Sequence, residues 1–380
     1  MLRRVAIVEV AQSPGVESKN SLMEFTYRTT KEVLDKASMT RDEVDTLVIA
    51  SSDVFHSGMS CANAFDIEGT GAVMKPHSRE DGDSIFAFIY ACMRIMSGHY
   101  DTALAVGLCK GSENPDNDTV TALYTDPFYL RPIGINETTA AAMQMRLYME
   151  RYGITEEQCA KVVVKNLGNA IYNPYAHIKK RVSVEDVLSS KKICDPLKAL
   201  ECAPKSDGVI SILLASEEKA MKLTKKPVWL KGYGCAMDTF LLGDRDLLNG
   251  QLKTAAASAY KMAGISNPRK EIDVAEICEP YAFQELLWCE HLGFCGEREG
   301  GKLIDSGVTE INGALPVNPS GGVLATNSYT SRGLSRVAEA ALQVKGKAGE
   351  HQVDKKVSTA LAHGTHGFAG QCHTVVILGS

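Results

Sequence analysis

The feature that most constrains the fold of this chain is a sequence unit that occurs twice. The segments "LDKASMTRDEVDTLVIASSD" (Leu34 to Asp53) and "YKMAGISNPRKEIDVAEICEP" (Tyr260 to Pro280) share one order: an apolar helix end, a polar turn, a basic-acidic pair and a strand. Each copy is followed by a second helix and by a strand that ends in glycine, "DTALAVG" and "VSTALAHG". This repetition predicts two similar α/β halves, stacked as layers around mainly parallel sheets.

We expect the first half to cover residues 1–225 and the second half residues 226–380. The boundary is predicted near "LTKKPVWLKGYG" (Leu223 to Gly234), where a charged stretch leads into an apolar strand and then glycine. The first half also contains a long insertion at about residues 112–203, in which Ala140 to Tyr152 has helical periodicity. Such an insertion either roofs a pocket or forms a solvent-facing subdomain.

Composition excludes several classes of function. The net charge of −5 is spread without long single-sign runs, which argues against nucleic acid as a partner. The N-terminal run "MLRRVAIVEVAQSPG" is too short and too polar for a signal sequence and predicts a first strand. With no apolar window long enough to span a membrane, we expect a soluble, cytoplasmic protein. The 11 cysteines form no CxxC pair, so we expect no metal in this chain and mostly buried thiols.

Three segments carry a resemblance to a known family. They are "NPSGGVLATNSYTSRGLSRVAEAALQVKG" (Asn318 to Gly346), "IMSGHYDTALAVG" (Ile95 to Gly107) and the ending "ALAHGTHGFAGQCHTVVIL". Together with the repeated halves they resemble the thiolase superfamily, especially its archaeal and lipid-transfer-like branch. The resemblance implies a five-layer α-β-α-β-α fold, usually dimeric, that acts on acyl-CoA thioesters, with coenzyme A as substrate or product.

The position of the family's nucleophile departs from the pattern. In that family a nucleophilic cysteine begins the helix before the "SG.YD" motif, and counting back from Gly98 places Asp81 at this position. A helix N-terminus stabilises a thiolate, but it stabilises a carboxylate equally well. Asp81 or Asp83 can therefore cap the helix, and the alternative is that Asp81 binds or orients substrate in place of the nucleophile.

The other site positions that the resemblance implies are partly altered. Asn327 stands where many thiolases have the histidine of Gly-His-Pro, and an amide can donate a hydrogen bond to an oxyanion but carries no charge. In "ICEPYAFQELL", Cys278 and Glu279 fill the Asn/His and acidic positions. His363 in "AHGTHG" occupies the position of the family's second acid/base, and Cys278 beside it is a candidate relocated nucleophile.

Three functions fit this set of residues. The first is thiolase-type acyl transfer to CoA, such as β-ketoacyl-CoA thiolysis, which the family and the Cys278–His363 combination favour. The second is a CoA-thioester retro-aldolase that acts on a β-hydroxyacyl-CoA without a covalent acyl-enzyme, which the missing cysteine favours. The third is a non-catalytic acyl-CoA-binding subunit. The resemblance also implies a homodimer and allows a separate small partner with a zinc ribbon and an OB-fold.

Overall fold

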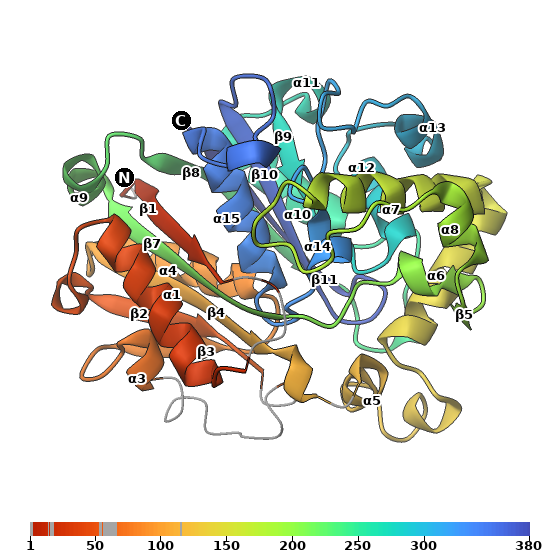
Figure 1. Ribbon diagram of the computed structural model, residues 1–380, viewed down its shortest axis with the longest axis horizontal. Coiled ribbons are helices and arrows are strands. Elements are labelled where there is room, and N and C mark those ends of the chain that lie inside the picture. Colours follow the sequence, from red (N-terminus) through yellow and green to blue (C-terminus); the bar gives the residue numbers. More distant parts are fainter. Residues whose placement is uncertain (1–2, 14, 16–18, 53–54, 56–66, 115) are drawn as a thin grey trace.

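The computed structural model describes residues 3–13, 15, 19–52, 55, 67–114 and 116–380 (Figure 1). The strands are β1 (Val5–Gln12), β2 (Thr46–Ala50), β3 (His77–Glu80), β4 (Thr102–Lys110), β5 (Lys192–Cys194), β6 (Leu197–Lys198), β7 (Asp207–Ser216), β8 (Val228–Met237), β9 (Val274–Glu276), β10 (Thr359–His366) and β11 (Cys372–Gly379). The helices before β8 are α1 (Leu22–Lys36), α3 (Ile67–Thr70), α4 (Ser84–Met96), α5 (Asn117–Ala122), α6 (Glu137–Tyr152), α7 (Glu156–Ala170), α8 (Val184–Ser189) and α9 (Glu217–Leu223). The later helices are α10 (Leu252–Ala263), α11 (Pro268–Glu271), α12 (Ala282–His291), α13 (Gly300–Asp305), α14 (Gly322–Ala325) and α15 (Arg332–Lys345).

Nine strands follow the order β3-β2-β4-β7-β1-β8-β11-β10-β9. In the first half β2 pairs with β4 in parallel, and β4–β7 and β7–β1 are antiparallel. The second half repeats this pattern, because β9 pairs with β10 in parallel and β10–β11 and β11–β8 are antiparallel. The proposed boundary at residues 225 and 226 lies between α9 and β8. In the described sheet, β1 of the first half and β8 of the second half pair at Ala6–Trp229 and Ile7–Val228.

The prediction of mainly parallel sheets is wrong, since most strand pairs in the order above are antiparallel. Residues 367–371 link β10 to β11, and a connection this short can only join antiparallel neighbours, because a parallel pair needs a crossover of a dozen or more residues. The repeat in sequence indicates which elements recur, but it carries no information on strand direction.

The layers follow from the alternation of side chains along the strands. In β1, Val5 and Ile7 face a core that they share with apolar residues of α4 and α15, whereas Ala6 and Val8 pack in a separate core with α1. The other face of the second half packs against α10 and α12. Helices α4 and α15 are therefore enclosed between the strands of the two halves, with α1 outside one half and α10 and α12 outside the other.

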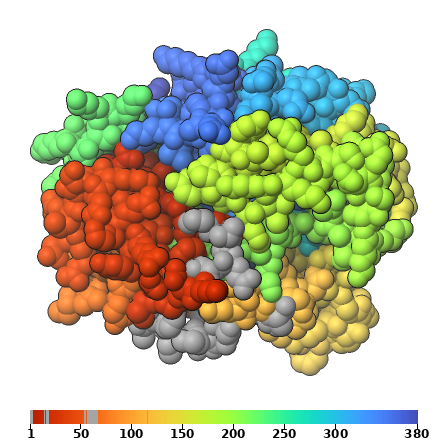
Figure 2. Space-filling view, viewed as in Figure 1, coloured from red at the N-terminus to blue at the C-terminus, as the bar shows by residue number. Residues whose placement is uncertain are grey.

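The insertion leaves and re-enters the first half at one point. It begins after β4 and ends before β7, and these strands pair along their length up to Lys110 and Asp207. The Lys110 ammonium and the Asp207 carboxylate form a buried ion pair of 3.1 Å at this junction. The predicted helix at Ala140 to Tyr152 is confirmed as α6, which Asn136 caps and Gly153 ends in the left-handed conformation. Figure 2 shows the yellow-green residues of the insertion covering one side of the molecule, beside the red N-terminal helix α1.

The predicted first strand is confirmed as β1. Among the helices that the structure describes, none combines the length and the apolar character needed to cross a membrane.

The contact between β8 and α10 gives a test of the fold. A Cβ added to Gly234 would lie 2.0 Å from the backbone oxygen of Ala255 in α10, whereas one added to Gly243 would meet nothing within 4 Å. We expect Gly234→Ala to lower the free energy of unfolding by about 1–3 kcal/mol, as overpacking of a rigid contact does. The matched control Gly243→Ala should change it by less than about 0.5 kcal/mol. Thermal unfolding followed by circular dichroism measures both, and equal melting temperatures would contradict the packing of α10 on β8.

Candidate active site

The acidic turn before α4 ends in a buried cap. Asp83 is 3% exposed, and its Oδ1 accepts hydrogen bonds from the backbone N–H of Ile85 at 2.8 Å and from Thr374 Oγ1 at 3.4 Å. Its Oδ2 has no hydrogen-bond partner among the described residues. Burial raises the pKa of Asp83 to about 6. Asp81 is exposed, so of the two candidate caps Asp83 is the one that caps the helix. The role of Asp81 toward substrate stays a prediction.

A buried arginine lies where four elements meet. Arg332 begins α15 and is 2% exposed. Its Nη2 donates to Glu137 Oε1 at 3.4 Å and to the backbone oxygen of Thr365 at 3.2 Å, and its Nη1 donates to Asn327 Oδ1 at 3.5 Å. The guanidinium also lies over the ring of Tyr329, 4.3 Å from the centroid. These contacts bring the start of α6, the turn before α15 and the end of β10 to one positive charge.

An aromatic cluster borders this charge. Tyr329 stacks on Phe55 with ring centroids 3.9 Å apart, and it interacts electrostatically with Glu137. The ring of His366 lies edge-on to Tyr329 at 6.3 Å, and burial lowers the pKa of His366 to about 4. A Cβ added to Gly82, whose φ is +140°, would lie 4.0 Å from the His366 ring. The turn that resembles the family's nucleophile position therefore adjoins the histidine segment at the end of β10.

Cys278 and His363 are neighbours, as the resemblance implied, but not as a thiol and its base. The backbone N–H of Cys278 donates to His363 Nδ1 at 3.3 Å, and His363 Nε2 lies 3.0 Å from His373 Nδ1. Burial lowers the pKa of His363 to about 3. Burial also raises the pKa of the Cys278 thiol to about 12. This environment favours a neutral imidazole and a neutral thiol, which is the opposite of a thiolate-imidazolium pair.

The Glu279 carboxylate packs against the glycine turn of "NPSGG". Its Oε1 accepts hydrogen bonds from Asn166 Nδ2 at 3.1 Å and from the backbone N–H of Leu324 at 3.2 Å. A Cβ on Gly322 would lie 1.9 Å from this oxygen, and Gly322 has a φ of +67°, so the position requires glycine on both grounds. Burial raises the pKa of Glu279 to about 8, with Glu285 adding to the rise. Glu279 thus anchors the turn that leads to Asn327.

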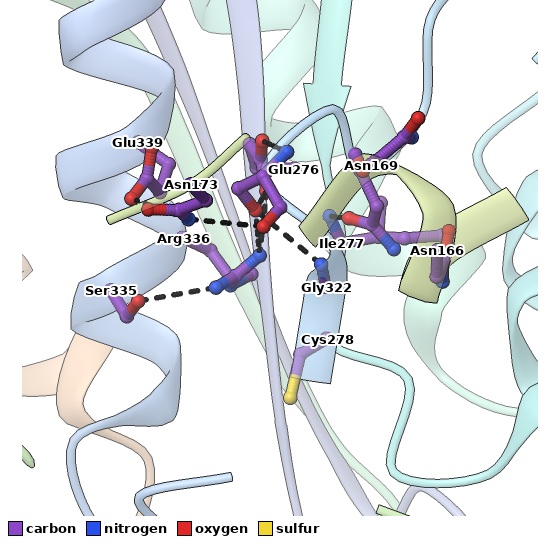
Figure 3. Close-up of polar contacts among 12 residues, drawn as sticks. Asn166, Asn169, Asn173, Glu276, Ile277, Cys278, Gly322, Ser335, Arg336 and Glu339 are labelled. Atoms are coloured by element: carbon purple, nitrogen blue, oxygen red, sulfur yellow. Dashed lines mark hydrogen bonds and ion pairs between the residues drawn. The ribbon is translucent and has the colours of Figure 1, made fainter. Parts of the chain in front are cut away.

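A second polar network supports the same turn (Figure 3). Arg336 Nη1 donates to Glu276 Oε2 at 2.6 Å and to Ser320 Oγ at 2.7 Å, and the Ser320 hydroxyl and backbone N–H both donate to Glu276. Glu339 accepts from Asn173 at 3.4 Å in the same network. Figure 3 shows Cys278 at the edge of this network, with its sulfur pointing away from Glu276. The network fixes α15 to the strand end that carries Cys278.

A cavity of about 460 Å³ lies between the insertion and the second half. Glu137 and Asn327 are among its polar lining residues, and Leu167, Ile178, Tyr281 and Leu324 are among its apolar lining residues. The backbone N–H of Asn327 donates to Ser206 Oγ at 3.2 Å, which holds this residue in the wall. The insertion therefore borders a pocket, one of the two roles that the sequence left open. Within the described part of the chain, no group of three His, Cys, Asp or Glu residues is placed to hold a metal ion.

Sequence reasoning identified the right segments but missed Arg332, Glu137 and the burial of Asp83. Arg332 follows Asn327 by only five residues, in the turn where the family's histidine is absent, and an arginine there was a signal that the positive charge had moved. Glu137 lies in the insertion, far from every motif, and no sequence pattern marks it.

Glu279 predicts a pH dependence of stability. Its pKa in the folded protein, about 8, is above its ordinary value of 4.5, so the folded state favours the protonated acid and this contribution is lost as pH rises from 4.5 through 8. Glu279→Gln, which mimics the protonated acid, should therefore gain stability relative to the parent between pH 6 and pH 8, by at most about 1.4 kcal/mol per pH unit. Urea denaturation of the variant and the parent at pH 6 and at pH 8 measures this difference in the free energy of unfolding. Exposed Glu218→Gln is the control, and the same pH response in both variants would contradict the assignment.

Comparison with known proteins shows which family the chain resembles. Residues 234–380 match the family model described as "Thiolase C-terminal domain-like". The acetyl-CoA acetyltransferase of Methanothermobacter thermautotrophicus is 34% identical over 281 residues, which cover 73% of this chain and 73% of that protein. Sterol carrier protein 2 of Homo sapiens is 27% identical over 376 residues, which cover 93% of this chain and 68% of that protein.

A solved structure described as the Ltp2-ChsH2(DUF35) aldolase has the same fold, with a TM-score of 0.85 over 100% of this chain and 99% of that chain and 24% identity. The fold, the match of the C-terminal part and the identity to the acetyltransferase agree with the resemblance carried by the motifs. The chain belongs to the thiolase superfamily.

Proposed function

We propose that this protein is a carbon–carbon lyase that cleaves β-hydroxyacyl-CoA thioesters by a retro-aldol reaction, without a covalent acyl-enzyme. The observation that carries the proposal is the composition of the site: Glu137 and Asn327 line a cavity and both contact the buried Arg332 guanidinium, whereas burial raises the pKa of the Cys278 thiol to about 12. Acyl transfer through an enzyme cysteine, the function that the sequence favoured, needs a thiolate. Retro-aldol cleavage needs only a base and a group that stabilises an enolate.

The reaction balances without another reactant. A base takes the proton of the β-hydroxyl, the Cα–Cβ electron pair moves into the thioester, and a carbonyl compound leaves. The resulting enolate then takes a proton at Cα, which gives a shortened acyl-CoA. Catalysis requires charge stabilisation at the thioester oxygen and a proton carrier near the β-hydroxyl.

Arg332 and Asn327 supply the charge stabilisation. The guanidinium is fixed by contacts of 3.2–3.5 Å, so it is in place before the negative charge develops. Asn327 lines the cavity and its Oδ1 accepts from Arg332, which leaves its amide N–H groups as donors to the thioester oxygen. In this way Arg332 restores the charge that Asn327 lacks relative to the family's histidine.

Glu137 and Tyr329 supply the proton transfer. Glu137 lines the cavity, pairs with Arg332 and interacts electrostatically with Tyr329. Burial raises the pKa of Glu137, which brings the carboxylate closer to the range in which general bases work. Tyr329 relays a proton between the substrate and Glu137.

The other predicted residues act by position. Because His363 accepts from the Cys278 N–H and Glu279 from the Leu324 N–H, each fixes the backbone of one wall of the site. The acyl-CoA enters along the cavity bordered by the insertion, whose apolar residues cover the pantetheine arm or the acyl chain.

The proposal predicts that one substitution lowers activity strongly and that another leaves it nearly unchanged. Arg332→Met should lower kcat for β-hydroxyacyl-CoA cleavage by about 10² or more, the scale of losing one preorganised oxyanion donor. Cys278→Ser replaces the thiol with a hydroxyl of similar size. It should change kcat by less than about threefold, because no step passes through the thiol. Cleavage is followed by the release of the carbonyl product and the shortened acyl-CoA, with circular dichroism as the control for folding.

The parent protein and the Cys278→Ser variant also distinguish the lyase from the two other functions considered, acyl transfer and non-catalytic binding. Loss of activity in Cys278→Ser together with an acyl mass on a cysteine after incubation with acyl-CoA would replace the lyase with acyl transfer, the activity named for the archaeal relatives. Absence of both cleavage and β-ketoacyl-CoA thiolysis, with acyl-CoA still bound, would leave a non-catalytic binding subunit.

The assembly is also part of the proposal. We expect a homodimer, since the family is usually dimeric and most oligomers have two-fold symmetry. A small partner with a zinc ribbon and an OB-fold is consistent with the structural neighbour, which is described as a complex of two named components. Light scattering of the purified chain, alone and with its natural partner, checks both points. A 41.1 kDa species at micromolar concentration in both samples would contradict them.

A further inference from the structure

The chain that follows β9 leads from the sheet to the wall of the cavity. Main-chain pairing of β9 with β10 ends at Glu276. Beyond this point the backbone N–H of Cys278 donates to a side chain instead, at 3.3 Å from His363 Nδ1. Pro280 and Tyr281 follow, and both line the cavity. The imidazole of His363 therefore holds the backbone at the place where the strand passes into the wall.

A second histidine holds the imidazole of His363. In the β10–β11 ladder His363 is opposite Val375, and His373 lies two residues from Val375, so both imidazoles lie on one face of the sheet. His363 Nε2 is 3.0 Å from His373 Nδ1, and the two ring planes are inclined by 23°. Both histidines are fully buried, and Trp288 of α12 lies edge-on to each of them. The pair is thus enclosed between the sheet and α12.

The two hydrogen bonds determine which ring nitrogens carry protons. A backbone N–H can only donate, so His363 Nδ1 accepts from Cys278 and carries no proton. A neutral imidazole has one N–H, which in His363 is then on Nε2. This N–H donates to His373 Nδ1, which leaves the proton of His373 on Nε2. The opposite direction would need two unprotonated nitrogens on His363, which a neutral imidazole does not have.

The same contacts oppose protonation of either ring. A proton on His363 Nδ1 would face the Cys278 N–H, and a proton on His373 Nδ1 would face the His363 N–H. Burial lowers the pKa of His363 to about 3 and that of His373 well below its ordinary value. His291 and the positive charge of Arg332 add to the effect on His363. Both nitrogens of His363 are therefore occupied within the protein, and neither is free to exchange a proton with a substrate.

We propose that His363 and His373 form a neutral imidazole pair with fixed tautomers, which positions the wall at Pro280 and Tyr281, and that His373 is a positioning residue for substrate binding. The inference rests on the proposed function, in which the cavity holds the acyl-CoA. His373 supplies the acceptor for the His363 Nε2–H, which keeps Nδ1 directed at the Cys278 N–H. Without that acceptor a buried N–H would lose its partner, so the ring would turn and release the backbone of the wall.

The first experiment observes the pair directly and needs no catalytic activity. Nitrogen-15 NMR of protein labelled at its histidines distinguishes protonated from unprotonated ring nitrogens, and His363→Gln and His373→Asn assign the two rings by the signals that disappear. We expect both rings in the Nε2–H form, with a scalar coupling across the N–H···N bond and no change in either ring between about pH 5.5 and pH 8. A proton on His363 Nδ1, or titration of either ring in this range, would overturn the proposal.

The second experiment compares two substitutions of His373. Asparagine retains an acceptor oxygen near the position of the histidine Nδ1, whereas leucine fills a similar volume without an acceptor. His373→Leu should raise KM for β-hydroxyacyl-CoA cleavage by about tenfold with a smaller effect on kcat, because the cavity wall is displaced while the charged groups remain. His373→Asn should keep KM within about threefold of the parent value. The matched control is the exposed His99→Leu, which should equal the parent in folding and in both constants.

The outcomes separate the inference from the function on which it rests. The parent KM in a folded His373→Leu would overturn the positioning role, and so would a fall of kcat at unchanged KM, which would indicate proton transfer through the pair. A parent protein without cleavage activity would refute the lyase. Calorimetric titration with acetyl-CoA then measures binding to the same variants, with the same difference of about tenfold expected. If His373→Leu does not fold, the NMR signals of the parent and the KM of His373→Asn decide the proposal.

Discussion

The rest of the site depends on the burial of one guanidinium. An arginine in a core costs several kcal/mol unless charges and hydrogen bonds replace the water that it loses. Arg332 obtains them from Glu137 in α6, from Asn327 in the turn before α15 and from Thr365 at the end of β10. Helix α6 and strand β10 are far apart in sequence, so the requirement to compensate one charge fixes their positions relative to α15. Two of these partners, Glu137 and Asn327, also line the cavity.

The sequence predicts local structure well where the signal itself is local. The run from Val5 is a strand, the insertion contains α6, and the "DGD" turn starts a helix, because each depends on neighbouring residues only. The internal repeat appears in the structure as a repeated order of strand pairing. Strand direction was not predictable, since it depends on the lengths and paths of connections rather than on periodicity.

The sequence predicts which segments form the candidate site, but it does not predict the chemical role of each side chain. The segments that hold Cys278, Arg332 and His363 do meet, as the contacts of Cys278 with His363 and of Arg332 with Thr365 demonstrate. What each side chain can do depends on burial, which differs sharply between Asp81 and Asp83 although they are two residues apart. Burial also gives Cys278 a high pKa, although the thiol lies beside a histidine. No spacing rule distinguishes a thiol paired with an imidazole from one that shares only its backbone N–H.

The junction of β4 and β7 has a consequence for how this protein can change during evolution. Since both strands are paired up to Lys110 and Asp207, the ends of the insertion are held together by the core, whatever lies between them. The loop-closure entropy of the segment is thus met by the sheet. Its helices α6 and α7 still contribute to the main core, where Met145, Tyr148 and Val162 are fully buried. The cavity is lined by both parts of the chain, since Glu137 belongs to the insertion and Asn327 to the second half. Changes in the lining residues of the insertion would therefore reshape one wall of the cavity, while the junction of β4 and β7 and the opposite wall stay in place.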